Sequence, residues 1–331
     1  MYRKLRLLVV PSSILVCVFL LVINLALLPT TPPRPRQPRE EDEKEVEAHK
    51  MVGRKNRILC WIPTSAENHY KRARHVKNTW ARHCHLHIFF SNIKDTELDS
   101  VKLEVSDGYE NLWGKTKAAL VYLHKHHLHH ADWFLKADDD TFVIVENLQN
   151  MLKLYDPNFP IFFGNKLKKP NISQGFMSGG AGYVLSEAAL QVVVVKGLTN
   201  THLCATTQSG REDVELGRCL ETVGVLAGDS RDHLGRSRFL SFTPGTMLRP
   251  GGILSHGHAW FHNLVYYPTK EGPSCCSSTA VSFHYVQPEM MYTIYYLVYT
   301  LRLAQPDHLP PRLPPDNNSI PEQVLAKYQR V

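Results

Sequence analysis

The stretch DWFLKADDDTFVIVENL (residues 132–148) sets three consecutive aspartates, Asp138, Asp139 and Asp140, directly after an apolar run. The run WFLK reads as a buried strand, so the carboxylates follow its carboxyl end. Like charges this close raise one another's pKa and destabilise the fold unless a cation joins them. In open α/β sheets, this edge of the sheet is where ligands bind. A solvated loop is the competing interpretation, and the rest of the chain decides between the two.

Apolar, strand-like runs alternate with helical patterns on both sides of this stretch. Strand-like runs occupy residues 57–62, 85–91, 100–106, 132–137 and 160–164, and helical patterns occupy residues 68–83, 111–128 and 187–195. This alternation predicts an α/β fold with a largely parallel central sheet flanked by helices. We expect residues 56–303 to form one compact domain that presents the acidic triple at a sheet edge.

The composition is that of a globular protein. Of the 331 residues 43% are hydrophobic and 21% are charged, and 38 basic against 31 acidic residues give a net charge of +7. Beyond the N-terminal region the excess positive charge is spread out, whereas a nucleic-acid groove requires a basic stripe. We therefore expect no nucleic-acid partner.

Residues 7–28 carry no charged side chain. A bilayer is crossed by about 20 apolar helical residues, so this segment predicts one transmembrane signal-anchor after a cytoplasmic tail (1–6). A cleaved signal peptide is the alternative, but its apolar core is usually shorter, about 7–15 residues. The proline-rich and charged residues 29–55 are typical of a stem, and residues 304–331 of a loose proline-rich tail.

Orientation across the membrane follows from the residues beyond the span. Basic residues flank the span on both sides, so positive charge alone does not decide. The far side carries six cysteines and the glycosylation acceptors Asn171 and Asn317. Both features suit an oxidising lumen, which predicts a cytosolic N-terminus and a lumenal domain.

Two further motifs have ordinary structural interpretations. The histidine-rich residues 124–130 follow an apolar helical face and are expected to cover its solvent side. The glycines of SGGAGY (178–183) do not form a phosphate-binding P-loop, because no Gly-Lys-Ser/Thr follows them. We expect them to allow a sugar to approach the backbone or to form a tight bend.

A set of motifs resembles one family when it is taken in order: WFLKADDDT, MSGGAGYVLS, EDVELGRC, AGDSRD, EGPSCC and AVSFHYV. Over about residues 56–303 the chain is similar to the core 1 β1,3-galactosyltransferases. The resemblance implies type II Golgi membrane proteins with a GT-A fold. These enzymes use manganese to transfer galactose from UDP-galactose, in β1,3 linkage, to the GalNAc on serine or threonine of mucin-type glycoproteins.

The resemblance also implies the site residues. Asp138, Asp140 and His284 would bind Mn²⁺, whose mixed oxygen and nitrogen preference they match. Asp213 would be the catalytic base of an inverting reaction, with the adjacent Glu212 as its close rival. The residues implied at the nucleotide sugar are Pro63, Gly108, Tyr109, Glu110, Lys115, Asp139 and Tyr285.

Trp260 matches an aromatic residue that contacts the acceptor GalNAc. The chain departs from the family in this region, because the usual run is richer in tryptophan and tyrosine, whereas AWFHNLVYYP contains Phe261, His262, Leu264 and Val265. We expect His262, Leu264 and Val265 to narrow or weaken peptide recognition. The implied disulfides are Cys60–Cys84, Cys204–Cys219 and the adjacent pair Cys275–Cys276.

Two other functions compete with this interpretation. A catalytically inactive paralogue that acts as a chaperone would lack the acidic triple, which this chain retains. A β1,3-transferase that uses a different UDP-sugar, as Fringe-like enzymes use GlcNAc, would keep it. The resemblance further suggests a homodimer and a dedicated chaperone as candidate partners.

Overall fold

The computed structural model describes residues 56–302, which lie in one compact unit. The predicted cytoplasmic tail, membrane span, stem and proline-rich tail lie outside the described residues, as does the glycosylation acceptor Asn317. Their boundaries therefore stay predictions. Within the described part, no helix combines the length and apolar character needed to cross a membrane.

A seven-stranded sheet with the order β10-β6-β9-β4-β1-β2-β3 lies at the centre of the domain. Strand β9 is antiparallel to its neighbours β4 and β6, and the other four pairings are parallel. The predicted α/β fold with a largely parallel sheet is confirmed, with β9 as the exception. The strands are β1 (Ile58–Pro63), β2 (Leu86–Ser91), β3 (Val101–Lys102), β4 (Trp133–Lys136), β6 (Ile161–Gly164), β9 (Tyr183–Ser186) and β10 (Leu226–Ala227).

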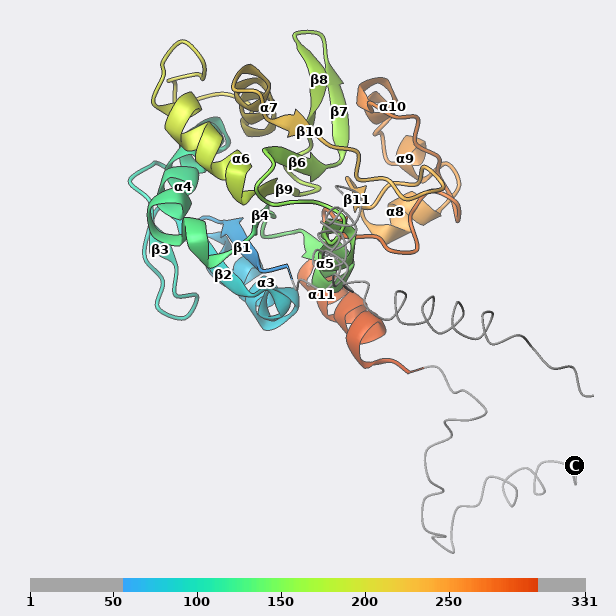
Figure 1. The fold of residues 1–331 in the computed structure, drawn as a ribbon. Helices are drawn as coiled ribbons and strands as arrows, with labels where there is room; N and C mark the ends of the chain where they lie inside the picture. Colours follow the sequence, from blue (N-terminus) through green and yellow to red (C-terminus); the bar gives the residue numbers. More distant parts are fainter. Residues whose placement is uncertain (1–55, 303–331) are drawn as a thin grey trace, which may run out of the picture. The chain divides into compact units, whose positions relative to one another are not determined.

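Each face of the sheet is covered by its own helices, because successive strand side chains point to opposite faces. Cys60 and Leu135 belong to a core that includes residues of α3, α5 and α11, whereas Trp61 and Phe134 belong to a core with α4, α6 and α7. Figure 1 shows these two groups of helices on either side of the sheet. The helices are α3 (Arg74–Asn78), α4 (Leu112–His127), α5 (Val145–Leu152), α6 (Glu187–Val192), α7 (Glu212–Thr222) and α11 (Pro288–Tyr295).

The helical pattern over residues 68–83 does not form one continuous helix. It divides into the π-helical segment η1 (His69–Ala73), α3 and the 3₁₀ segment η2 (Trp80–His83). Thr79 separates the last two with the non-helical angles φ −114° and ψ −108°, and its hydroxyl donates to the His75 carbonyl at 2.6 Å. Local bonding by the threonine side chain competes with the helical ladder here. Other short helical segments are η3 (Tyr109–Asn111), η4 (Leu128–His130), η5 (Val193–Leu198) and η6 (Tyr296–Thr300).

A smaller three-stranded sheet places a C-terminal strand next to the segment that carries the acidic triple. Strand β12 (Ser282–Phe283) pairs in parallel with β11 (Phe239–Leu240) and antiparallel with β5 (Phe142–Val143). Since β5 directly follows the aspartates, the residue after β12, His284, is brought next to Asp140. The remaining elements are the hairpin β7 (Lys166–Lys169) with β8 (Ile172–Met177), and the helices α8 (Pro244–Leu248), α9 (Gly252–Ser255) and α10 (Trp260–Leu264).

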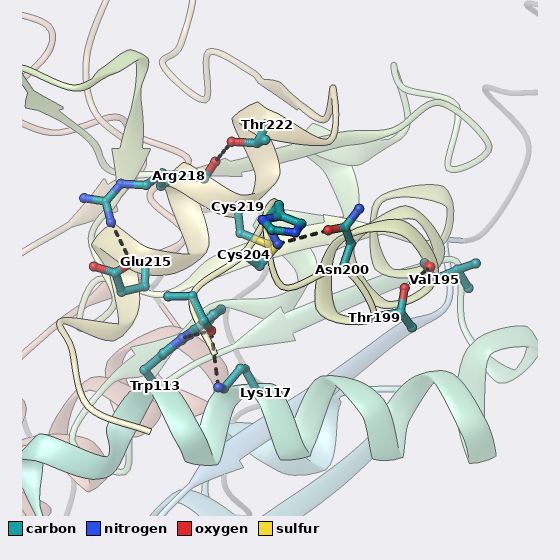
Figure 2. The surroundings of a disulfide bond; sticks show 12 residues. Trp113, Lys117, Val195, Thr199, Asn200, Cys204, Glu215, Arg218, Cys219 and Thr222 are labelled. Atoms are coloured by element: carbon teal, nitrogen blue, oxygen red, sulfur yellow. Dashed lines mark hydrogen bonds and ion pairs between the residues drawn. A yellow bond between two sulfur atoms is a disulfide. The ribbon is translucent and has the colours of Figure 1, made fainter. Parts of the chain in front are cut away.

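All three implied disulfides are present, Cys60–Cys84, Cys204–Cys219 and Cys275–Cys276. The second joins the loop of residues 199–211 to α7 (Figure 2). Trp113 and Lys117 of α4 both donate hydrogen bonds to the Ala205 carbonyl in that loop, at 3.0 and 3.3 Å. The loop that precedes α7 is thus attached both to α4, through Ala205, and to α7, through Cys219.

Candidate active site

One cleft of about 870 Å³ collects most of the residues that the sequence predicted. It lies where β1 and β4 end, where β9 begins and where α7 begins, which is the sheet edge expected to bind ligands. The predicted residues that line it are Pro63, Gly108, Tyr109, Lys115, Asp138, Asp139, Asp140, Asp213, Trp260, His284 and Tyr285. Glu110 is not among the lining residues and is exposed to solvent.

Asp138, Asp140 and His284 form a compact group in the lining of the cleft. One ligand atom from each lies within 4.8 Å of the others. The His284 Nε2 atom is 3.2 Å from Asp140 Oδ1 and 3.9 Å from Asp138 Oδ2. Burial opposes ionisation of Asp140, but the hydrogen bond and charge of His284, together with the charges of Arg72 and Lys136, outweigh it and lower the pKa of this carboxyl. Two carboxylates and an imidazole at this spacing fit a divalent transition-metal ion.

Asp139 is held differently from its neighbours. Its Oδ2 accepts a hydrogen bond from the Thr64 hydroxyl at 2.7 Å, and its Oδ1 lies 3.6 Å from Arg72. Burial raises the pKa of Asp139 to about 6, although the Thr64 hydrogen bond opposes the change. The central aspartate therefore connects the acidic triple to the end of β1 and to η1.

Glu212 and Asp213, the two candidate bases, occupy different environments at the start of α7. Glu212 is buried, accepts from the Tyr183 hydroxyl at 2.5 Å with Oε1, and has Oε2 3.8 Å from the Lys136 ammonium. Burial raises the pKa of Glu212 against the opposing effect of Lys136. The Asp213 side chain is 15% exposed and has Oδ2 3.4 Å from the Gly179 amide. Of the two carboxylates, that of Asp213 is the more exposed.

Gly179 and Gly180 make room for protein side chains. A Cβ atom on Gly180 would lie 2.0 Å from the His284 ring, and one on Gly179 would lie 2.6 Å from Glu212 Oε2. The Gly182 amide also donates to the Gly179 carbonyl at 3.0 Å, which closes a tight turn before β9. The expected bend is confirmed, and the observed close neighbours are His284 and Glu212.

Residues 54–269 match the model of the family described as Fringe-like. The chain belongs to this family. The match includes the acidic triple, Asp213 and Trp260, and it ends before His284.

Curated relatives of this Fringe-like chain are glycosyltransferases. It is 46% identical over 251 residues to glycoprotein-N-acetylgalactosamine 3-beta-galactosyltransferase 1 of Xenopus laevis, covering 76% of this chain and 68% of the relative. It is 27% identical over 174 residues to the beta-1,3-glucosyltransferase of Mus musculus, covering 52% of this chain and 35% of that protein. A solved structure of galactosyltransferase LgtC aligns over 74% of this chain and 97% of its own, with 11% identity and a TM-score of 0.39. The Xenopus relative confirms the resemblance drawn from the motifs.

Trp260 lines the cleft of the Fringe-like domain and is 47% exposed. It lies beside Phe242, which also stacks with His258, and Tyr285 completes this aromatic wall. Two of the neighbouring departures, His262 and Val265, are absent from the cleft lining. His262 pairs with Glu271 at 2.9 Å, and Val265 is buried in the core below. Of His262, Leu264 and Val265, only Leu264 lines the cleft. We therefore expect only Leu264 to affect recognition of the acceptor peptide directly.

Sequence reasoning missed several residues of the cleft. Lys136 is buried between carboxylates, and Arg72 lies 3.1 Å from Asp140. The Ser241 hydroxyl is buried without a hydrogen-bond partner, a property it shares among the described residues only with two indole nitrogens. The sequence contains one indication of these residues: Lys136 interrupts an otherwise apolar strand, and charged residues are rarely fully buried unless they are paired. Nothing in the sequence indicated that Arg72 or Ser241 would lie in the cleft.

Proposed function

We propose that this chain is an inverting, metal-dependent glycosyltransferase with a GT-A arrangement. It moves galactose from UDP-galactose, in β1,3 linkage, to GalNAc-α-Ser/Thr of mucin-type glycoproteins, which makes the core 1 O-glycan (T antigen). The single observation that carries this proposal is that one cleft holds both a carboxylate–histidine group and a separate, partly exposed carboxylate. The identity to the Xenopus galactosyltransferase supports the choice of donor and acceptor.

We propose that Asp138, Asp140 and His284 bind Mn²⁺. Their oxygen and nitrogen donors lie within 4.8 Å of one another, which fits that ion. The ion, when bound, supplies positive charge that offsets the charge developing on the departing diphosphate. On the protein side, Arg72 and Lys115 add positive charge to the same cleft. Lys115 is buried and paired with Asp107, which holds its ammonium at the cleft wall.

Asp213 takes the proton in the proposed reaction. As the acceptor hydroxyl oxygen forms its bond to the anomeric carbon, its proton passes to Asp213, and the bond from that carbon to UDP breaks with the electron pair leaving on the diphosphate. Attack on the face opposite the leaving group inverts the anomeric centre. Trp260 is 47% exposed and offers an aromatic face on which the acceptor sugar can pack, and the buried Phe242 lies beside it.

The cellular setting is also a proposal. We propose a single-pass type II Golgi membrane protein anchored by residues 7–28, with the described domain in the lumen. Three disulfides and the exposed Asn171, between β7 and β8, suit an oxidising compartment. A second copy of the chain and a dedicated chaperone remain candidate partners within this proposal.

The donor and acceptor are tested together with the purified full-length chain. We expect galactose transfer from UDP-galactose to a GalNAc-bearing peptide with Mn²⁺, detected by mass spectrometry, and no comparable product from UDP-GlcNAc or UDP-glucose. Transfer from UDP-GlcNAc instead would favour the alternative transferase. The inactive paralogue would be favoured if the chain transferred no sugar from any donor and instead acted as a chaperone for an active transferase.

Replacing Trp260 with alanine is expected to lower acceptor kcat/KM by about ten- to a hundredfold. Loss of an aromatic face that packs on a sugar costs about 1–3 kcal/mol. Hydrolysis of UDP-galactose without acceptor should change little, because the carboxylate–histidine group is untouched. Leu254→Ala, which truncates an exposed side chain on α9 outside the cleft, is the control. An equal fall in transfer and hydrolysis would identify Trp260 as a packing residue.

A further inference from the structure

Lys136 is the last residue of β4, and it lines the same cleft as Asp138 and Asp213. Its side chain is only 4% exposed. The ammonium is 2.6 Å from Asp138 Oδ1, 3.1 Å from the Gly179 carbonyl and 3.8 Å from Glu212 Oε2. A lysine ammonium has three donor hydrogens, and three acceptors surround this one. Because an isolated buried charge is costly, these partners fix where the ammonium lies.

The first partner is a carboxylate of the proposed metal site. The Oδ1 atom of Asp138 pairs with Lys136, whereas its Oδ2 atom is the one that lies 3.9 Å from His284 Nε2. The two oxygens of one carboxylate thus face different groups. Lys136 can hold Asp138 in place without occupying the oxygen nearer His284.

The other two partners lead to the proposed base. Gly179 accepts from Lys136 with its carbonyl, and its amide lies 3.4 Å from Asp213 Oδ2. Glu212, the residue before Asp213, is fixed from its opposite oxygen by the Tyr183 hydroxyl at 2.5 Å. Two short routes, one through a backbone and one through a side chain, therefore connect Lys136 to Asp213.

The sheet builds this arrangement directly. Lys136 and Tyr183 are paired residues on the antiparallel strands β4 and β9. Paired residues on adjacent strands have Cβ atoms about 4.5–5.5 Å apart, so both side chains can reach Glu212 at the start of α7. Neither Lys136 nor Tyr183 needs a mobile loop to hold its position.

We propose that Lys136 is a positioning residue that fixes the base Asp213 relative to the carboxylate Asp138. This inference rests on the proposed function, because it assigns Lys136 a role that is exerted through Asp213. It assigns no proton transfer to Lys136 itself. Glu212 and Tyr183 belong to the same arrangement as supports.

A double-mutant cycle tests the inference in the full-length chain. Lys136→Met should lower kcat by about a hundredfold, the usual cost of misplacing a catalytic group by about 1 Å, with the acceptor KM little changed. In the Asp213→Asn background the same change should cost less than about threefold, because the group that Lys136 positions is already disabled. Lys125→Met, which removes an exposed lysine of α4 outside the cleft, is the matched control.

Mn²⁺ binding provides a second readout, measured by the electron paramagnetic resonance of the free ion. We expect the Kd for Mn²⁺ in Lys136→Met to stay within about threefold of the unmodified chain, since Asp140, His284 and Asp138 Oδ2 remain. If Lys136→Met does not fold, Tyr183→Phe takes its place in the cycle, because it removes one hydrogen bond to Glu212 and no charge. We expect Tyr183→Phe to lower kcat in the unmodified chain and to have no further effect on kcat in the Asp213→Asn background. The proposal would be overturned if Lys136→Met lowered kcat by the same factor with Asp213 and with Asn at position 213. It would also be overturned if a loss of Mn²⁺ affinity accounted for the whole loss of kcat. An unmodified chain without transferase activity would refute the proposed function instead.

Discussion

Asp140→Asn is expected to lower galactosyl transfer by at least about 10²–10³-fold, the range for removing one group that stabilises transition-state charge. Asp140 offers the carboxylate oxygen nearest to His284, at 3.2 Å, and also pairs with Arg72 at 3.1 Å. An asparagine has almost the same shape, but it is neutral and replaces one oxygen by a hydrogen-bond donor. The change should therefore remove charge from the proposed metal site while the fold stays intact.

Two measurements accompany the assay of Asp140→Asn. The affinity for Mn²⁺ should fall in step with activity, and the thermal unfolding midpoint should change little. Asp156→Asn removes the same charge from an exposed residue outside the cleft, and it should retain both activity and Mn²⁺ affinity. Full activity of Asp140→Asn, or of the unmodified chain in excess chelator, would contradict the metal-dependent mechanism.

Asp213→Asn is expected to lower kcat by about 10²–10⁴-fold, the usual contribution of a general base. Because Asp213 is separate from the carboxylate–histidine group, the affinities for UDP and Mn²⁺ should stay close to those of the unmodified chain. Glu215→Gln is the matched control, since Glu215 belongs to the same first turn of α7 and pairs with Arg218 outside the cleft. Normal turnover of Asp213→Asn together with a severe loss in Glu212→Gln would move the base to the neighbouring residue.

Much of the fold could be predicted because its signals are local. The apolar runs that became β1, β2, β4 and β6 are short and bounded by polar residues, and the acidic triple follows β4 as its sequence indicates. The antiparallel direction of β9 could not be predicted from its own residues, because the short run YVLS is compatible with a strand of either direction. The broken helix over residues 68–83 depends on the backbone angles of a single threonine.

The residues that share the candidate cleft could be predicted in part. Asp138, Asp140 and Asp213 stand in motifs, so the resemblance could locate them, and their roles stay predictions. The part played by Lys136 arises only when β4 pairs with β9 and the start of α7 packs above them, which brings its partners Gly179 and Glu212 within reach. The sequence predicts that His262 and Val265 affect recognition because they lie in the same run as Trp260. In the structure, His262 pairs with Glu271, and Val265 is buried in a hydrophobic core.

The most direct test of the proposed function is the structure of the reaction product. The purified full-length chain is incubated with UDP-galactose, Mn²⁺ and a peptide that carries GalNAc on threonine, and the glycopeptide is analysed by nuclear magnetic resonance. We predict one galactose, β-linked to O3 of the GalNAc, which records both the inverted centre and the regiochemistry. An α-linked galactose, attachment at another hydroxyl, or release of free galactose with no glycopeptide product would contradict the account.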